Sequence, residues 1–203
     1  MAKIFSVSAR AAVSRYVDPV ARALLRAGIS PNAVTVAGAA GVVAGAVGFG
    51  ARGHLVPGAL VVTLFAFTDL LDGAMARARG GSSRFGALLD STMDRIADGA
   101  IFGAVAYWLA VTGDRPSAAA ALLCLVLGQV VSYVKARAEG AGLRCDVGVA
   151  ERTERLVLVG VGGLATGLGL SWALPAALWL LAALSVVTVG QRLAHVRAQD
   201  RAA

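Results

Sequence analysis

The stretch Asp69–Asp94, DLLDGAMARARGGSSRFGALLDSTMD, places four carboxylates on the two sides of a short polar link. Asp69 and Asp72 are three residues apart, and Asp90 and Asp94 are four apart. On helices these spacings put each pair on one face. The flanking sequence is apolar enough for a membrane, where isolated carboxylates are costly. We therefore predict a functional site whose charges are neutralised by metal ions or basic groups.

The composition around this stretch predicts a membrane protein. The chain has 203 residues, of which 58% are hydrophobic and 15% charged. A membrane-spanning helix needs roughly 20 apolar residues, so about six spans use up the chain. We predict an all-α integral membrane protein with six transmembrane helices, near residues 32–49, 57–75, 85–111, 117–134, 151–169 and 172–192.

A basic segment precedes the first predicted span. Asp18 followed by Pro19 predicts a helix start, and from there Val20 and Leu24 share an apolar face. A short basic amphipathic helix beside a first span is typical of a membrane-surface element. We therefore divide the chain into three segments: a juxtamembrane segment 1–30, a transmembrane domain 31–197 and a polar tail 198–203.

The charge distribution gives an orientation. The net charge is +7, and of the 19 Lys and Arg residues all but Arg52 and Arg115 fall on one side of the six predicted spans. The basic side of a membrane protein faces the cytoplasm. Because all four aspartates lie near that side, we predict a multi-pass protein of the plasma membrane whose active site opens to the cytoplasm. The chain shows little soluble surface, which argues against nucleic-acid binding.

The four carboxylates can converge if the short link folds their helices antiparallel. Hard oxygen ligands in a cluster suit Mg²⁺ or Mn²⁺, and two ions bound to phosphates are the usual partners of such a set. Gly73 leaves room for a ligand near the backbone, and Arg77 is a cation suited to a phosphate. The alternative is a set of ion pairs inside the bundle, for example with Arg95. Asp98 continues the Asp90 and Asp94 face, and it either supports the site or is structural.

The motif Asp69-x-x-Asp72-Gly73-x-x-Ala76-Arg77, eight residues, then Gly86-x-x-x-Asp90-x-x-x-Asp94, resembles the complete signature of the CDP-alcohol phosphotransferases. The resemblance implies a homodimeric membrane enzyme of phospholipid biosynthesis that cleaves a CDP-linked lipid. It implies that the metal ligands, which hold two Mg²⁺ or alternatively Mn²⁺ ions, are Asp69, Asp72, Asp90 and Asp94. Asp94 would also be the general base. The implied contacts to CDP-diacylglycerol are Ser30, Pro31, Asn32, Ala33, Gly73, Arg77 and Ser83.

A second, basic cluster is a candidate for the acceptor site, because charged donors can hold an acceptor that carries its own phosphate. Its members are Ser132, Lys135, Arg137, Arg152, Arg155 and Arg192. Membrane topology alone is the alternative, since basic residues collect at cytoplasmic helix ends. The sequence around this cluster resembles the actinobacterial members of the family that transfer the phosphatidyl group of CDP-diacylglycerol to inositol 1-phosphate and release CMP.

Two other functions stay open. Glycerol 3-phosphate, the acceptor of phosphatidylglycerophosphate synthases, would also need a basic pocket. A cation carrier could use the aspartates as an ion site, but that function would leave Gly73, Ala76 and Arg77 unexplained.

Overall fold

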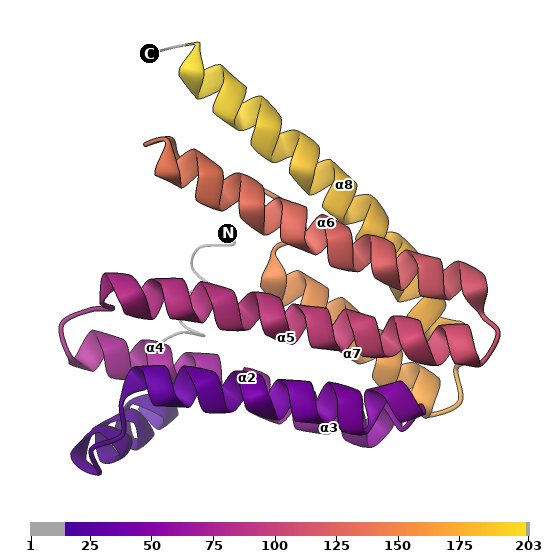
Figure 1. Ribbon diagram of the computed structural model, residues 1–203, viewed down its shortest axis with the longest axis horizontal. Helices are drawn as coiled ribbons and strands as arrows, with labels where there is room; N and C mark the ends of the chain where they lie inside the picture. Colours follow the sequence, from indigo (N-terminus) through magenta and orange to yellow (C-terminus); the bar gives the residue numbers. More distant parts are fainter. Residues whose placement is uncertain (1–14, 202–203) are drawn as a thin grey trace. The chain divides into compact units, whose positions relative to one another are not determined.

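The computed structural model describes residues 15–201, and over that range the chain consists of helices and connecting loops (Figure 1). No strand occurs in this range, which confirms the all-α prediction. The helices are residues 15–26, α2 (Pro31–Gly48), the 3-10 turn η1 (Gly50–Arg52), α3 (Leu55–Ala66), α4 (Thr68–Ala78), α5 (Arg84–Val111), α6 (Arg115–Gly140), α7 (Arg152–Gly167) and α8 (Ala173–Asp200).

Four helical stretches in the described part of the chain are long and apolar enough to cross a membrane. They are Pro31–Arg52, Leu55–Ala78, Arg115–Gly140 and Ala173–Asp200. The other two predicted spans correspond to α5, whose 28 residues carry the charges of the motif, and to α7, which has only 16 residues. The second predicted span is interrupted at Phe67, between α3 and α4, and α8 continues to Asp200, into the predicted tail.

Contacts divide the described residues into two compact units. The first comprises residues 15–43 and 61–97, and the second comprises 44–60 and 98–201. The boundaries between the units fall inside α2, α3 and α5, and the division of the chain into segments 1–30, 31–197 and 198–203 stays a prediction. All four motif aspartates belong to the first unit, and the whole basic cluster belongs to the second.

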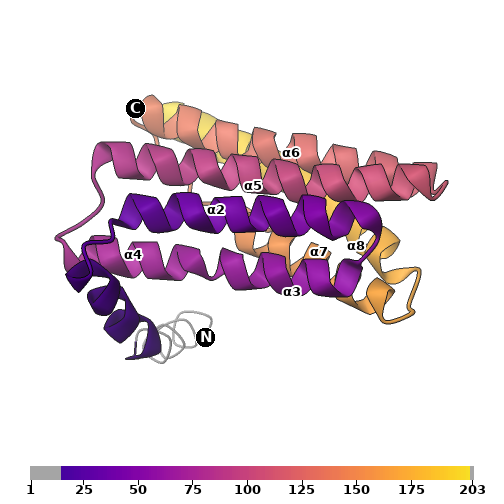
Figure 2. The same cartoon turned by 60° about the horizontal axis from the view of Figure 1, so that its bottom comes forward.

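The N-terminal helix belongs to the first unit and lies beside α4 (Figure 2). Ala21 is buried in a cluster with Val34, Ala74 and Met75, and the partly buried side chains around that cluster include Leu24. The helix already includes residues 15–17, so the predicted start at Asp18 is wrong. The predicted apolar face is also divided, because Val20 is exposed while Leu24 packs inward.

In the second unit, α8 is the common partner of α6 and α7. α6 and α8 run side by side, as Figure 1 shows. The start of α6 follows from its sequence, because the Asp114 side chain accepts a hydrogen bond from the Ser117 amide at 3.1 Å and Pro116 fits the first turn.

Glycines let α2 approach its neighbours within the first unit. A Cβ atom at Gly41 would overlap the ring of Phe65, and one at Gly38 would overlap the Thr68 side chain. At Gly48, near the other end of α2, a Cβ atom would meet nothing within 4 Å.

We expect Gly41→Ala to lower the free energy of unfolding by about 1–3 kcal/mol, because the added methyl group overpacks the contact with Phe65. The matched control Gly48→Ala should be neutral or stabilising by up to about 1 kcal/mol, since alanine favours the helix and no neighbour is displaced. Chemical unfolding of the two variants in detergent measures the difference. Equal stability would mean that α2 does not pack through Gly41.

Candidate active site

The first unit contains a pocket of about 370 Å³ at the polar link of the motif. Its wall is built from the start of α2, the middle of α4, the link itself and the start of α5. The lining residues are Ser30, Pro31, Asn32, Thr35, Asp72, Gly73, Ala76, Arg79, Gly81, Ser82, Ser83, Gly86, Ala87, Asp90 and Ser91.

Two helices begin at this pocket, each with a serine cap. The Ser30 hydroxyl accepts a hydrogen bond from the Ala33 amide at 3.2 Å, which makes Ser30 the N-cap of α2. The Ser83 hydroxyl accepts from the Gly86 amide at 2.9 Å and caps α5 in the same way. Helix N-termini attract anions through their free amides and their dipole. The N-termini of α2 and α5 therefore favour a phosphate-bearing ligand in this pocket.

The link also keeps the two helix starts close together. A Cβ atom at Gly86 would lie 3.2 Å from the Asn32 amide oxygen and 3.1 Å from the Ser83 hydroxyl. The backbone at Gly80 and Gly81 has positive φ angles of 93° and 125°, which glycine adopts without strain. These glycines let the chain turn sharply between α4 and α5.

Asp72 is the buried carboxylate of the motif, with 7% of its surface exposed. The hydroxyl of Thr35 donates a hydrogen bond to its Oδ2 at 2.6 Å. Asp69 and Asp90 lie near enough for their charges to act on Asp72. Asp69 and Asp94 are half-buried and Asp90 is exposed, but only Asp72 and Asp90 line the pocket.

Thr35 is a site residue that the sequence analysis missed. It lies one turn after Pro31 in an otherwise apolar helix, and its hydroxyl oxygen also lies 3.1 Å from the Pro31 carbonyl oxygen. A buried polar side chain one turn beyond a capped helix start is the signal that could have identified it.

The donor set of this site suits a hard divalent cation, since carboxylate and hydroxyl oxygens are the ligands that Mg²⁺ and Mn²⁺ prefer. Within residues 15–201, however, no three His, Cys, Asp or Glu side chains are arranged so that they could hold a metal ion. A metal centre made of the four aspartates therefore requires their side chains to close around the ion, and the ligand set stays a prediction.

The structure brings most, but not all, of the predicted CDP-lipid contacts to the pocket. Ser30, Pro31, Asn32, Gly73 and Ser83 line it, whereas Ala33 and Arg77 do not. Arg77 is exposed and instead lines a smaller neighbouring pocket of about 260 Å³ with Asp18 and Arg22.

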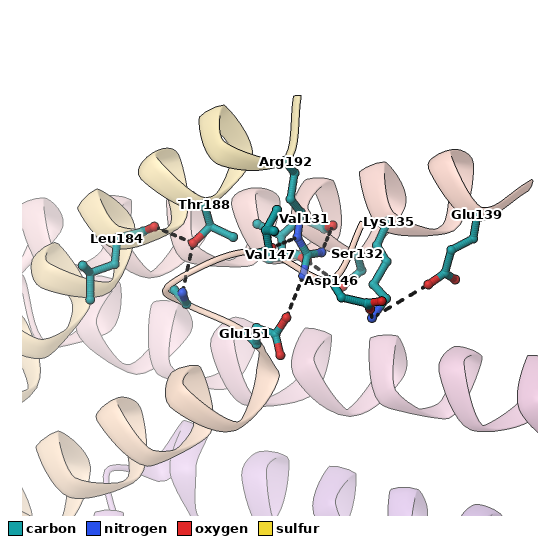
Figure 3. A network of polar contacts seen from close by, with 12 residues as sticks. Val131, Ser132, Lys135, Glu139, Asp146, Val147, Glu151, Leu184, Thr188 and Arg192 are labelled. Carbon is teal, nitrogen blue, oxygen red and sulfur yellow. Dashed lines mark hydrogen bonds and ion pairs between the residues drawn. The ribbon is translucent and has the colours of Figure 1, made fainter. Parts of the chain in front are cut away.

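The predicted basic cluster lies in the second unit, and most of its members already contact other groups of the protein there. Arg192 is buried, and it donates to the Val147 carbonyl at 2.8 Å, to the Val131 carbonyl at 2.6 Å and to Glu151 at 3.1 Å (Figure 3). Lys135 donates to Asp146 at 2.7 Å. Arg192 is therefore held by three contacts within the second unit, and its role at the acceptor phosphate stays a prediction.

Arg155 is also buried, with 1% of its surface exposed, and donates to Asp98 at 2.8 Å. Its guanidinium occupies space left by Gly128, where a Cβ atom would lie 2.6 Å from Nη1. Arg152 lies 3.5 Å from the other oxygen of Asp98. Asp98 therefore joins the two arginines, a contact that the sequence analysis did not predict.

The remaining two cluster members differ in their contacts. Ser132 donates to the Gly128 carbonyl one turn earlier in α6, at 3.1 Å, and is half-buried. Arg137 is exposed, consistent with its position on a different face of α6 from Lys135.

Comparison with known proteins defines the class. Residues 28–191 match the family model described as CDP-alcohol phosphatidyltransferase. The chain belongs to this family, which confirms the predicted family. It is therefore an enzyme of the CDP-alcohol phosphatidyltransferase class.

Several curated relatives are named phosphatidylinositol phosphate synthase. The protein of that name from Mycobacterium marinum is 53% identical over 188 residues, covering 91% of this chain and 80% of the relative. The one from Streptomyces avermitilis is 50% identical over 200 residues, covering 95% and 82%.

Solved structures of the Mycobacterium tuberculosis phosphatidylinositol phosphate synthase are similar throughout. The structure with CDP-DAG bound has a TM-score of 0.86 and 49% identity, covering 90% of this chain and 94% of that one. A second structure, in complex with manganese and citrate, has a TM-score of 0.85 at 49% identity and covers 89% and 88%.

Proposed function

We propose that this protein transfers the phosphatidyl group of CDP-diacylglycerol to a hydroxyl of inositol 1-phosphate and releases CMP. The observation that supports this proposal best is the pocket that combines Asp72, Gly73 and Asp90 of the motif with the starts of α2 and α5. The pocket occurs in a chain about half identical to relatives named phosphatidylinositol phosphate synthase. The chain would thus be a phosphatidylinositol phosphate synthase.

In this proposal the aspartates hold the metal ions. Asp69, Asp72, Asp90 and Asp94 are the ligands of two Mg²⁺ ions, or of Mn²⁺, the metal present in one similar structure. When bound, divalent cations neutralise the diphosphate and stabilise the leaving CMP. Thr35 orients Asp72 by its hydrogen bond, and a ligand oriented in this way is pre-organised for the ion.

The chain's own groups then carry the transfer. Asp94 takes the proton from the acceptor hydroxyl, whose oxygen attacks the phosphorus that bears the diacylglycerol. A new phosphorus–oxygen bond forms to the acceptor, and the bond to CMP breaks. The pocket residues Ser30, Pro31, Asn32, Gly73 and Ser83, with Ala33 and Arg77 outside it, contact the CDP-lipid. Asp94 contributes mainly by position, because a nearby cation makes a carboxylate a weak base.

The acceptor phosphate is held by the second unit. Lys135 and Arg152 are half-buried, so their charged groups can reach a ligand without a rearrangement of the core. Arg155 is held by its hydrogen bond to Asp98, and Arg192 is held by its hydrogen bond to the Val147 carbonyl in the loop before α7. We assign direct phosphate contacts to Lys135 and Arg152, and a supporting position to Arg155, Arg192 and Ser132.

We further propose the membrane arrangement that the sequence predicts. α5 and α7 complete six spans, residues 15–26 lie at the membrane surface, and the three segments are 1–30, 31–197 and 198–203. The site faces the cytoplasm at the plasma membrane, as the basic side requires. The protein acts as a homodimer on membrane lipid.

An acceptor panel tests the function. Purified protein in detergent receives CDP-diacylglycerol and Mg²⁺ with inositol 1-phosphate, glycerol 3-phosphate, free inositol or serine, and CMP release is measured. We expect release with inositol 1-phosphate well above every other acceptor. Release with glycerol 3-phosphate alone would instead indicate a phosphatidylglycerophosphate synthase.

Metal removal should abolish this activity. With EDTA in excess we expect CMP release to fall to the uncatalysed level, since the diphosphate and four carboxylates then face one another without neutralisation. Readdition of Mg²⁺ or Mn²⁺ should restore it, and titration with each ion gives the preference. Activity that persists in EDTA would contradict the four-carboxylate metal site.

A further inference from the structure

The loop between α6 and α7, residues 141–151, carries a carboxylate to Lys135. Asp146 accepts a hydrogen bond from the Lys135 ammonium at 2.7 Å, while Glu139 lies farther away at 3.8 Å (Figure 3). The same hydrogen bond holds the pKa of the Asp146 carboxyl below its usual value, so this carboxylate is ionised at neutral pH.

This loop is fixed to α8 along its length. The Arg144 amide and carbonyl both pair with the Gln199 side chain, at 3.0 and 2.6 Å. The Ala150 amide donates to the Thr188 hydroxyl at 2.9 Å, and Arg192 donates to the Val147 carbonyl. Asp146 therefore lies in a segment whose backbone is anchored on both sides of it.

We propose that Asp146 occupies the phosphate position on Lys135 and is displaced by the acceptor's phosphomonoester, which makes Asp146 a determinant of acceptor affinity. The proposal rests on the proposed function for the identity of the acceptor, but the chemistry it requires is only that of a phosphate dianion.

The exposure of the two partners makes this exchange feasible. The Asp146 side chain is 73% exposed, so after displacement it returns to water at little cost. Exposed ion pairs are weak, and a phosphate carries more charge and more acceptor oxygens than a carboxylate. An acceptor without a phosphate has no anionic group that could replace Asp146 on Lys135. The Lys135–Asp146 ion pair therefore disfavours the binding of neutral polyols.

Arg192 shows the opposite arrangement. Its guanidinium is buried and donates to two backbone carbonyls as well as to Glu151. Backbone carbonyls cannot swing away as an aspartate side chain can. Displacement is therefore expected at Lys135 and not at Arg192.

Asp146→Asn tests the proposal with inorganic phosphate as the probe. Isothermal titration of the purified protein should show phosphate binding about two- to fivefold tighter in the variant, which corresponds to the loss of one exposed ion pair. The KM for inositol 1-phosphate should fall by the same factor, while the KM for CDP-diacylglycerol is unaffected. Glu139→Gln, which removes the same charge from a carboxylate farther from Lys135, should produce a smaller change.

A double variant separates displacement from a general charge effect. In a Lys135→Ala background, Asp146→Asn should no longer change phosphate binding. Equal tightening with and without Lys135, or unchanged or weaker phosphate binding in the single variant, would overturn the proposal. If phosphate binding tightens but inositol 1-phosphate is not a substrate, the proposed function fails and the displacement stands.

Discussion

Asp94→Asn is expected to reduce kcat by about a thousandfold or more, while the protein still folds and binds CDP-diacylglycerol. The amide cannot accept the proton of the acceptor hydroxyl, and it binds a divalent cation more weakly than a carboxylate does. Asp94 is half-buried on α5, 3.9 Å from Arg95, so a neutral side chain of the same shape should be accommodated without a change of fold. Steady-state CMP release and thermal unfolding in detergent measure the two effects.

Two comparison variants distinguish the loss of a general base from a loss of ion affinity and from a general effect of charge. Asp69→Asn should also lower activity, but excess Mg²⁺ should recover part of that loss, because the defect is in ion affinity. The loss in Asp94→Asn should persist at every Mg²⁺ concentration. Asp200→Asn removes an exposed carboxylate at the end of α8 and should leave kcat unchanged. A kcat for Asp94→Asn within tenfold of the unmodified protein would exclude Asp94 as the base.

Asp98→Ala is expected to lower the free energy of unfolding by about 3–5 kcal/mol, because it leaves the buried Arg155 charge without its partner carboxylate. Both side chains are at most 4% exposed and are joined by a 2.8 Å contact. Denaturant titration in detergent measures the loss. The KM for the phosphorylated acceptor should rise as well, since Arg152 is oriented by the same carboxylate.

The paired variant Asp98→Ala/Arg155→Met is the control for the buried charge. Removing both charges should recover much of the stability lost in Asp98→Ala alone, although acceptor binding stays impaired. Gly128→Ala should impair acceptor binding by a different route, because its methyl group would displace the Arg155 guanidinium. If the double variant were no more stable than Asp98→Ala, the ion pair would not be the source of the stability.

The fold was predictable where local rules decide it. Ser30 and Pro31 define the start of α2, and Asp114 with Pro116 defines the start of α6. The start of the N-terminal helix was not predictable from Asp18, because that helix is positioned by the packing of Ala21 against Ala74 and Met75, residues distant in sequence.

In the candidate site, too, the motif residues were predictable from the sequence, but their tertiary contacts were not. The spacing predicts that all four aspartates converge, and of these Asp72 and Asp90 line one pocket with Gly73, whereas Asp69 and Asp94 do not line it. The partners of the polar groups were not predictable: Thr35 with Asp72, Asp98 with Arg155, and Arg192 with the loop are contacts between distant segments. Sequence shows that a basic residue is present, but only its tertiary partners show whether it is fixed by the protein or available to a ligand.

The most direct test of the account is the identity of the lipid product. Purified protein with CDP-diacylglycerol and Mg²⁺ receives inositol 1-phosphate and glycerol 3-phosphate at equal concentration, and the lipids are identified by mass spectrometry. We predict phosphatidylinositol phosphate that retains its phosphomonoester and is converted to phosphatidylinositol by a phosphatase. Phosphatidylglycerol phosphate as the main product, or no new lipid, would contradict the account.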